Sequence, residues 1–317
     1  MPSKLFPGDF FRPRSIPPLP DPAQGEKAQG RLLSFAEILR LVRLLAGMGV
    51  NKVRLTGGEP LLREDIEHLV AELAIIPGIK TLGLTTNGVL LQERLRALKE
   101  AGLSLLNVSL DTLRPERFEK ITLHNHYHRV RQNLEAAIEA GFSPLKLNTV
   151  IVKGFNEDEI LDFVELARAR PLNVRFIEYM PFDSNLWRYE DFVSCRQVRK
   201  LIERKYTLIP LERDLHAPDV AREYRIKGFR GTIGFIAPLS DQFCRNRNRL
   251  RLTADGCLKL CLHHQLEIDL AEPLRSGASD AELERIIRTG LKNKPAGHRA
   301  FEAVGAKGGR SMRQLGG

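Results

Sequence analysis

The sequence predicts an α/β protein built on a partial β/α barrel, followed by a β-hairpin and a final helix. The alternation of two kinds of segment along the chain indicates this fold class. Short apolar segments alternate with amphipathic helical segments, and such repeats give parallel strands joined by right-handed crossovers. An open doubly wound sheet is the alternative. We expect strands at 52–56, 81–85, 104–110, 145–152 and 173–179, with helices near 64–75, 92–101, 127–140 and 157–168.

Two helix starts have the capping-box pattern, in which a serine and a glutamate three residues later satisfy free backbone N–H groups. Ser34 and Glu37 precede apolar residues at helical spacing, so the first ordered helix is expected to begin there. Ser279 and Glu282 predict the start of a last helix near 280–292.

Polar or glycine-rich sequence stands at or beside the end of each expected strand. Ligands of parallel α/β folds bind at the carboxyl ends of the strands, so these segments together predict one shared pocket. Ordinary turn chemistry explains any one segment alone, since glycine and asparagine are common loop residues. The segments are 56–60, 85–88, 109–111, Lys146 with Asn148, and 178–181.

The stretch 245–261 predicts a β-hairpin with a three-residue turn. That turn pairs Arg251 with Lys259. Because strand side chains alternate, the basic residues and cysteines then share one face and the leucines share the other. A row of arginines suits phosphate groups or purine edges, and a solvated charged face is the alternative.

The net charge of the chain indicates which kinds of partner it could bind. The net charge of +10 suits a polyanionic partner, either a small phosphate ester or nucleic acid, and a merely basic surface is equally compatible with it. Nucleic acid is the less expected partner because no aromatic stacking platform accompanies the arginines.

No apolar run reaches the length of a membrane span, and no signal segment is visible, so we expect a cytoplasmic protein. Three of the four cysteines, Cys244, Cys257 and Cys261, lie close together and favour a metal or cluster site over disulfides.

Several short motifs occur along the chain in a fixed order. They are Arg54-Leu-Thr-Gly-Gly-Glu-Pro60, Thr85-Thr-Asn-Gly88, Val108-Ser-Leu-Asp111, Lys146-Leu-Asn148, Glu178-Tyr-Met-Pro181, the run 248–256 and the final Gly316-Gly317. From residue 31 onward the chain resembles the GTP 3′,8-cyclase family, lyases of molybdenum cofactor (molybdopterin) biosynthesis in the radical S-adenosylmethionine (SAM) superfamily. The resemblance implies an incomplete TIM-like β/α barrel of the radical SAM type at 31–205, a C-terminal cluster and GTP-binding region at 206–317, and an irregular, proline-rich tail at 1–30.

The resemblance also implies ligands for individual residues. GTP would be contacted by Arg54, Thr85, Lys146, Arg249, Leu250 and Arg251, and SAM by Gly58, Ser109 and Met180. In the family, one [4Fe-4S] cluster cleaves SAM reductively and a second cluster holds the GTP base. Cys244 and Cys261 match two ligands of the second cluster. A homodimer and contact with a downstream enzyme of the molybdopterin pathway are further expectations.

The chain departs from the family at its cluster ligands. No cysteine precedes Cys195, so the N-terminal cluster, which needs sulfur ligands, is not expected. Arg247 stands where the second cluster needs its middle ligand, so that cluster is doubtful too. Cys257 is a candidate replacement, although at about 3.3 Å per residue it would lie about 13 Å from Cys261 along the strand.

Two explanations of this departure stay open. In one, a frameshift or misassigned start has replaced the authentic first strand and its three cysteines. In the other, the chain has diverged into a catalytically dead GTP-binding relative, which Arg247 favours because an upstream frameshift does not explain it. In both cases the sequence as written predicts no radical conversion of GTP toward cyclic pyranopterin monophosphate.

Overall fold

The computed structural model describes residues 32–181, 187–212, 221–241, 249–260 and 266–292. Its main sheet has the strand order β1-β2-β3-β4-β5-β8-β7-β6. The pairs β1–β2, β3–β4, β4–β5 and β5–β8 are parallel, whereas β7 pairs antiparallel with β8 and β6. The strands are β1 (Lys52–Leu55), β2 (Thr81–Thr86), β3 (Leu105–Ser109), β4 (Leu145–Ile151), β5 (Leu172–Glu178), β6 (Leu208–Pro210), β7 (Arg222–Ile226) and β8 (Thr232–Ile236). The predicted α/β fold with parallel strands is therefore confirmed.

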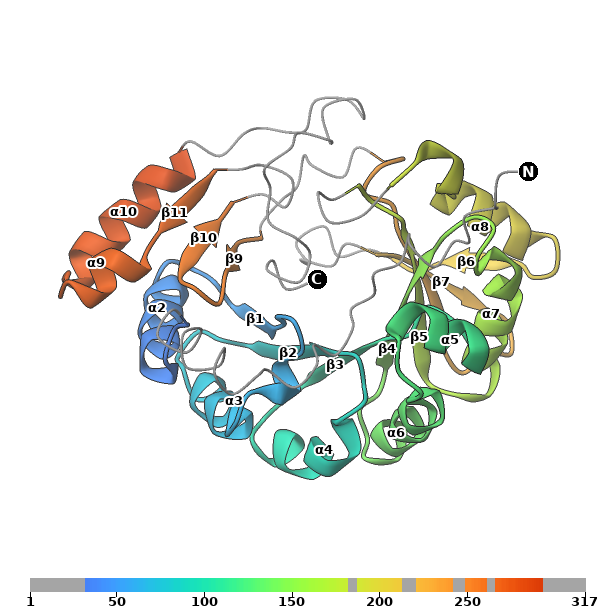
Figure 1. Cartoon of the computed structure of the whole chain (residues 1–317), viewed down its shortest axis with the longest axis horizontal. Helices are drawn as coiled ribbons and strands as arrows, with labels where there is room; N and C mark the ends of the chain where they lie inside the picture. Colours follow the sequence, from blue (N-terminus) through green and yellow to red (C-terminus); the bar gives the residue numbers. More distant parts are fainter. Residues whose placement is uncertain (1–31, 182–186, 213–220, 242–248, 261–265, 293–317) are drawn as a thin grey trace, which may run out of the picture. The chain divides into compact units, whose positions relative to one another are not determined.

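Helices separate the parallel strands along the chain, as the labels of Figure 1 show. They are α2 (Phe35–Gly47), α3 (Ile66–Ala74), α4 (Leu91–Glu100), α5 (Pro115–Thr122), α6 (Tyr127–Glu139), α7 (Ile160–Ala169), α8 (Cys195–Glu203), α9 (Ala271–Arg275) and α10 (Asp280–Lys292). Sequence analysis did not anticipate α5, α8 or α9. The start of α8 has a local signal, because Ser194 and Gln197 form a capping box like that of α2.

The chain divides into two compact units. Unit 1 includes residues 85–95 and 106–247, and unit 2 includes 16–84, 96–105 and 248–317. The proposed tail at 1–30 lies outside the described residues. None of the helices within the described ranges combines the length and the apolar character that crossing a membrane requires.

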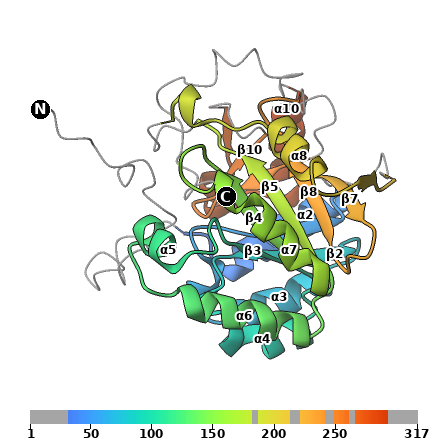
Figure 2. The same ribbon diagram turned by 90° about the vertical axis from the view of Figure 1, so that its right-hand side faces the viewer.

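The sheet of unit 1 has an apolar face covered by helices. Val108 is in register with Leu147, and Leu147 with Val174, and all three side chains are 0% exposed. Phe176, two residues further along β5, meets Phe163 of α7 with their ring centroids 6.4 Å apart. In Figure 2, α7 runs across this part of the sheet. Because side chains alternate along a strand, the residues between these positions point to the opposite face.

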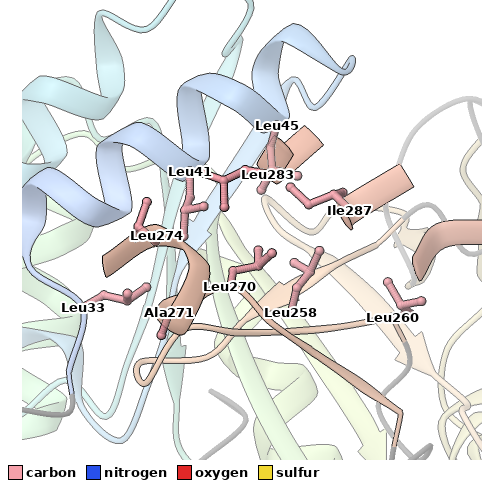
Figure 3. Packing of buried hydrophobic residues seen from close by; sticks show 10 residues of the cluster. All are labelled: Leu33, Leu41, Leu45, Leu258, Leu260, Leu270, Ala271, Leu274, Leu283 and Ile287. Carbon is pink, nitrogen blue, oxygen red and sulfur yellow. The ribbon is translucent and has the colours of Figure 1, made fainter. Parts of the chain in front are cut away.

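Unit 2 joins its first helix to its C-terminal elements through one apolar core (Figure 3). A three-stranded sheet in the order β11-β10-β9 contributes β9 (Arg251–Leu252), β10 (Cys257–Lys259) and β11 (Glu267–Asp269). Helices α2, α9 and α10 supply the other side chains. The cluster contains Leu33, Leu41, Leu45, Leu258, Leu260, Leu270, Ala271, Leu274, Leu283 and Ile287.

The predicted hairpin is confirmed. Lys259 is opposite Arg251, and Leu258 is opposite Leu252, as a three-residue turn requires. Leu258 is 0% exposed in the apolar core, and Leu252 packs against that core. The leucine face is therefore buried, which fixes the register because a slip of one residue would move the leucines to the other face.

Both predicted capping boxes are present in unit 2. Ser34 N donates to Glu37 Oε2 at 2.6 Å, and Ser279 N donates to Glu282 Oε2 at 2.7 Å. Glu37 also accepts a hydrogen bond from Arg275 Nε at 2.9 Å, and that bond is the main reason that the pKa of Glu37 lies below its usual value. This ion pair ties α2 to the end of α9.

Replacing Leu41 with alanine should lower the free energy of unfolding by about 2–5 kcal/mol, because a fully buried leucine leaves a cavity in the core of unit 2. The matched control is Ile75→Ala, at a side chain that is 73% exposed, with an expected change of less than about 0.5 kcal/mol. Urea unfolding followed by circular dichroism measures both. Equal effects of the two variants would contradict the packing described for this core.

Candidate functional site

The second face of the unit 1 sheet carries a block of polar side chains. Asn107 is in register with Lys146, and Lys146 with Asn173. One step along the strands, Ser109 is in register with Asn148. Neighbours in register on parallel strands point to the same side, so this group forms a polar face. The two predicted ligand-binding residues Lys146 and Ser109 are therefore brought together on adjacent strands.

The polar face is largely shielded from solvent. Lys146 is 6% exposed and Asn107 is 5% exposed, whereas Ser109 and Asn148 are partly exposed. Thr85, near the end of β2, is 9% exposed. Burial of an ammonium group or a carboxamide is costly unless hydrogen bonds compensate for the lost water. A face of this composition therefore needs hydrogen bonds, either from the chain itself or from a ligand.

Two carboxamide oxygens on this face have unused hydrogen-bonding capacity. Asn107 Oδ1 and Asn148 Oδ1 are both buried, and neither has a hydrogen-bond partner among the residues that the structure describes. A buried acceptor without a donor costs about 1–3 kcal/mol. Such groups are rare in folded proteins, and each calls for an explanation such as an ordered water, an ion or a functional role.

Arg175 is a buried cation on the same face that sequence analysis missed. Its Nε donates to Asn173 Oδ1, and its Nη2 donates to Glu223 Oε1 at 2.6 Å. A Cβ atom at Gly234 on the neighbouring strand would lie 3.1 Å from Arg175 Cγ, so the glycine leaves room for the arginine side chain. The available signal was the spacing of Asn173 and Arg175, two polar residues that alternate with the apolar residues Leu172, Val174 and Phe176.

The end of β5 is held by a buried carboxylate. Glu178 is 1% exposed and accepts hydrogen bonds from the backbone N–H groups of Cys195, Leu239 and Ser240 at 2.9–3.0 Å, and from the Ser240 hydroxyl. This carboxylate therefore serves the fold rather than the predicted pocket. It fixes the chain just before Met180, one of the predicted SAM residues.

The loop after β3 is fixed by a second set of buried polar groups. Asp111 Oδ1 accepts from Val150 N at 2.8 Å, and Asn156 Nδ2 donates to the Asp111 carbonyl at 2.6 Å. Glu159, which is 0% exposed, accepts from Thr112 Oγ1 at 2.8 Å. The loop that follows Ser109 is thus bonded to β4 and to the start of α7, which restricts where Ser109 can lie.

Unit 2 holds two more predicted residues near β1. A Cβ atom at Gly83 would lie 3.2 Å from Arg54 Cζ, so the Arg54 guanidinium passes over this glycine on the neighbouring strand. A Cβ atom at Gly58 would meet nothing within 4 Å. The open space beside the Gly58 backbone fits the approach of a ligand. The adjacent Glu59 accepts from Leu61 N at 3.1 Å and so anchors the turn.

The basic side of the hairpin lies in unit 2 as well. Arg251 is opposite Lys259, and Lys259 Nζ pairs with Glu267 Oε1 at 2.8 Å, with the lysine side chain only 2% exposed. Arg249 is exposed, and Leu250 packs against the apolar core. Glu267 compensates the Lys259 charge, and the Arg/Lys face of the hairpin is the one that sequence analysis predicted.

Two of the four cysteines, Cys195 and Cys257, lie within the described residues. Cys195 is 6% exposed, its Sγ lies 3.3 Å from the Ile236 carbonyl oxygen, and burial raises the pKa of its thiol. Cys257 is partly exposed at the start of β10. Within the described ranges, no three His, Cys, Asp or Glu side chains are grouped to hold a metal. Cys244, Arg247 and Cys261 lie outside the described residues.

Comparisons with known proteins give the family. Residues 16–167 match the Radical SAM superfamily, and residues 172–300 match Molybdenum Cofactor Synthesis C. A "GTP 3′,8-cyclase" of Moorella thermoacetica is 45% identical over 298 residues, which is 93% of this chain and 91% of that protein. The chain belongs to the GTP 3′,8-cyclase family. The motif-based resemblance and the radical SAM type of the α/β fold are thereby confirmed.

Two further relatives are similar in sequence to about the same degree. The "GTP 3′,8-cyclase, mitochondrial" of Arabidopsis thaliana is 45% identical over 287 residues, which is 90% of this chain and 73% of that protein. The "Molybdenum cofactor biosynthesis protein 1" of Bos taurus is 46% identical over 270 residues, 84% of this chain. This chain spans only 42% of the bovine protein.

Proposed function

We propose that this chain takes part in molybdenum cofactor biosynthesis as a GTP- and SAM-binding GTP 3′,8-cyclase relative that does not start the radical reaction with its own residues. The observation that supports it most strongly is the polar face of unit 1. Lys146 is buried there beside two carboxamide oxygens without donors in the described structure. A nucleotide bound at this face would meet one cation and two acceptors that have no donor among the described residues.

Each unit contributes its own set of nucleotide-binding residues to this proposal. In unit 1, Lys146 and Thr85 bind GTP, and Ser109 and Met180 bind SAM. In unit 2, Arg54, Arg249, the Leu250 backbone and Arg251 bind GTP, and Gly58 leaves room for SAM. Lysine and arginine neutralise phosphate charge through charge-assisted hydrogen bonds. A homodimer, a downstream pathway enzyme as partner and a cytoplasmic location remain part of the proposal.

The proposal does not include cleavage of SAM by this chain. A [4Fe-4S] cluster, when bound, supplies the electron that cleaves SAM, and its irons require thiolate ligands. The sequence has no cysteine before Cys195, and Cys195 is buried with a raised thiol pKa. The N-terminal cluster is therefore not part of the proposal. Cys244 and Cys261 remain candidate ligands of a C-terminal cluster, with Arg247 in place of the third and Cys257 as a possible substitute.

Replacing Lys146 with methionine should weaken GTP binding roughly 10- to 100-fold, because a charge-assisted hydrogen bond contributes about 1.5–3 kcal/mol. Isothermal titration calorimetry with GTP measures this loss. Lys120→Met, at an exposed lysine of α5 in the same unit, is the matched control and should bind GTP like the parent chain. Absence of GTP binding by the parent chain would overturn the proposed function.

Replacing Gly58 with alanine should weaken SAM binding while leaving the unfolding temperature unchanged, since the added Cβ meets nothing within 4 Å of the folded chain. Equilibrium dialysis with labelled SAM and thermal unfolding measure the two effects. Gly47→Ala, at another glycine with nothing within 4 Å, is the control and should leave SAM binding unaltered. If Gly58→Ala bound SAM normally, this part of the site would be wrongly assigned.

Anaerobic treatment with iron and sulfide should give a chain that does not cleave SAM when a low-potential reductant is added, because the thiolates for the N-terminal cluster are missing. Chromatography of the products measures SAM cleavage. An active family member that carries those cysteines serves as the positive control. Cleavage of SAM by this chain would show that other residues assemble the cluster.

A further inference from the structure

The buried side-chain oxygens of Asn107 and Asn148 distinguish these residues from Asn133 and Asn156, two other asparagines of unit 1. Asn133 Nδ2 donates to the carbonyl oxygens of Gly88 and Val89 at 2.7 and 3.0 Å. Asn156 uses both ends of its carboxamide, donating to Asp111 O and accepting from Val152 N at 2.6 and 2.8 Å. These asparagines hold loops. By contrast, the oxygens of Asn107 and Asn148 have no donor in the described part of the chain.

Folding alone does not account for this pair. A leucine has a similar size and would avoid the cost of a buried acceptor without a donor. Residues that lower stability in this way are typical of functional sites.

The position of the pair relative to Lys146 indicates the chemistry of its ligand. Asn107 is directly opposite Lys146 on the next strand, and Asn148 lies two residues beyond Lys146 on the same strand and face. Two residues of strand span roughly 6.6 Å. The two carboxamides and the lysine therefore start from neighbouring positions of one face, within the span of one small ligand.

A ligand that satisfies this arrangement places an anionic group at Lys146 and hydrogen-bond donors on either side of it. In a nucleoside triphosphate the groups next to the phosphates are the hydroxyl groups of the ribose, whereas the donors of the base are farther away. Hydroxyl groups donate to carboxamide oxygens, but phosphate oxygens do not. The acceptors therefore fit the sugar.

We propose that the side-chain oxygens of Asn107 and Asn148 accept hydrogen bonds from the ribose hydroxyl groups of the bound GTP. The pair thus selects ribonucleotides over deoxyribonucleotides. This inference deepens the proposed function and depends on it, since it requires that the polar face of unit 1 binds GTP.

The test compares GTP with 2′-deoxy-GTP, 3′-deoxy-GTP and inosine triphosphate, which lacks the amino group of guanine. Calorimetry on the full chain should show roughly tenfold weaker binding of at least one deoxy analogue by the parent chain. In Asn107→Leu and Asn148→Leu, GTP should bind more weakly, and at least one variant should bind GTP and that analogue about equally. Asn107→Asp keeps an oxygen acceptor and should retain the preference for ribose.

Thermal unfolding separates this role from a structural one. Without nucleotide, the Asn107→Leu and Asn148→Leu variants should unfold at the same temperature as the parent chain or higher, because no hydrogen bond to a described residue is lost. Asn133→Leu is the matched control. It should unfold at a lower temperature, because the Gly88 and Val89 carbonyl groups lose their donor.

Each outcome decides a separate point. If the parent chain binds GTP but both leucine variants keep the preference for ribose, the acceptor pair is overturned and the proposed function stands. If the variants lose discrimination against inosine triphosphate instead, the pair contacts the base and the sugar assignment is wrong. Failure of the parent chain to bind GTP overturns both proposals together.

Discussion

Register between parallel strands is the constraint on which the candidate site of unit 1 depends. Hydrogen bonds between β3, β4 and β5 bring every second residue of each strand to the same face. On the apolar face this register joins Val108, Leu147 and Val174 under the helices, and burial of that row makes any slip costly. The opposite face then necessarily carries Asn107 and Lys146 side by side. Packing on one face thus positions the polar chemistry on the other.

Buried polar groups fix the chain where packing alone would leave it free. Glu178 gathers four donors at the end of β5, and Glu159 and Asn156 hold the loop after β3. Each buried charge or amide of this kind is stable because its hydrogen bonds replace those lost with water. Asn107 and Asn148 differ from these groups, because their buried side-chain oxygens have no hydrogen-bond donor among the described residues. The polar face therefore combines rigid surroundings with unused bonding capacity, which is the usual state of a preorganised binding site.

Family membership implies both nucleotide binding and radical chemistry, but the residues of this chain support only nucleotide binding. Its relatives named GTP 3′,8-cyclase align over nine-tenths of its length, and the polar residues expected at the ends of the strands are present. The thiols required by the N-terminal cluster are not in the sequence. Binding residues and redox ligands are separable, because a nucleotide needs cations and acceptors whereas iron needs sulfur. The proposed function follows from that separation, since it retains nucleotide binding and assigns no radical step to the chain's own residues.

The sequence by itself determined the features that depend on neighbours a few residues away. The capping boxes at Ser34 and Ser279 and the turn that pairs Arg251 with Lys259 are of this kind, and the alternation of apolar segments also predicted the parallel strands. Only the tertiary structure decided which polar groups serve the fold and which remain available to a ligand. Glu178 finds its donors 17 to 62 residues further along the chain, and Arg175 needs Glu223 and the space above Gly234. Such partners meet only when the strands pair, so local sequence carries no record of them.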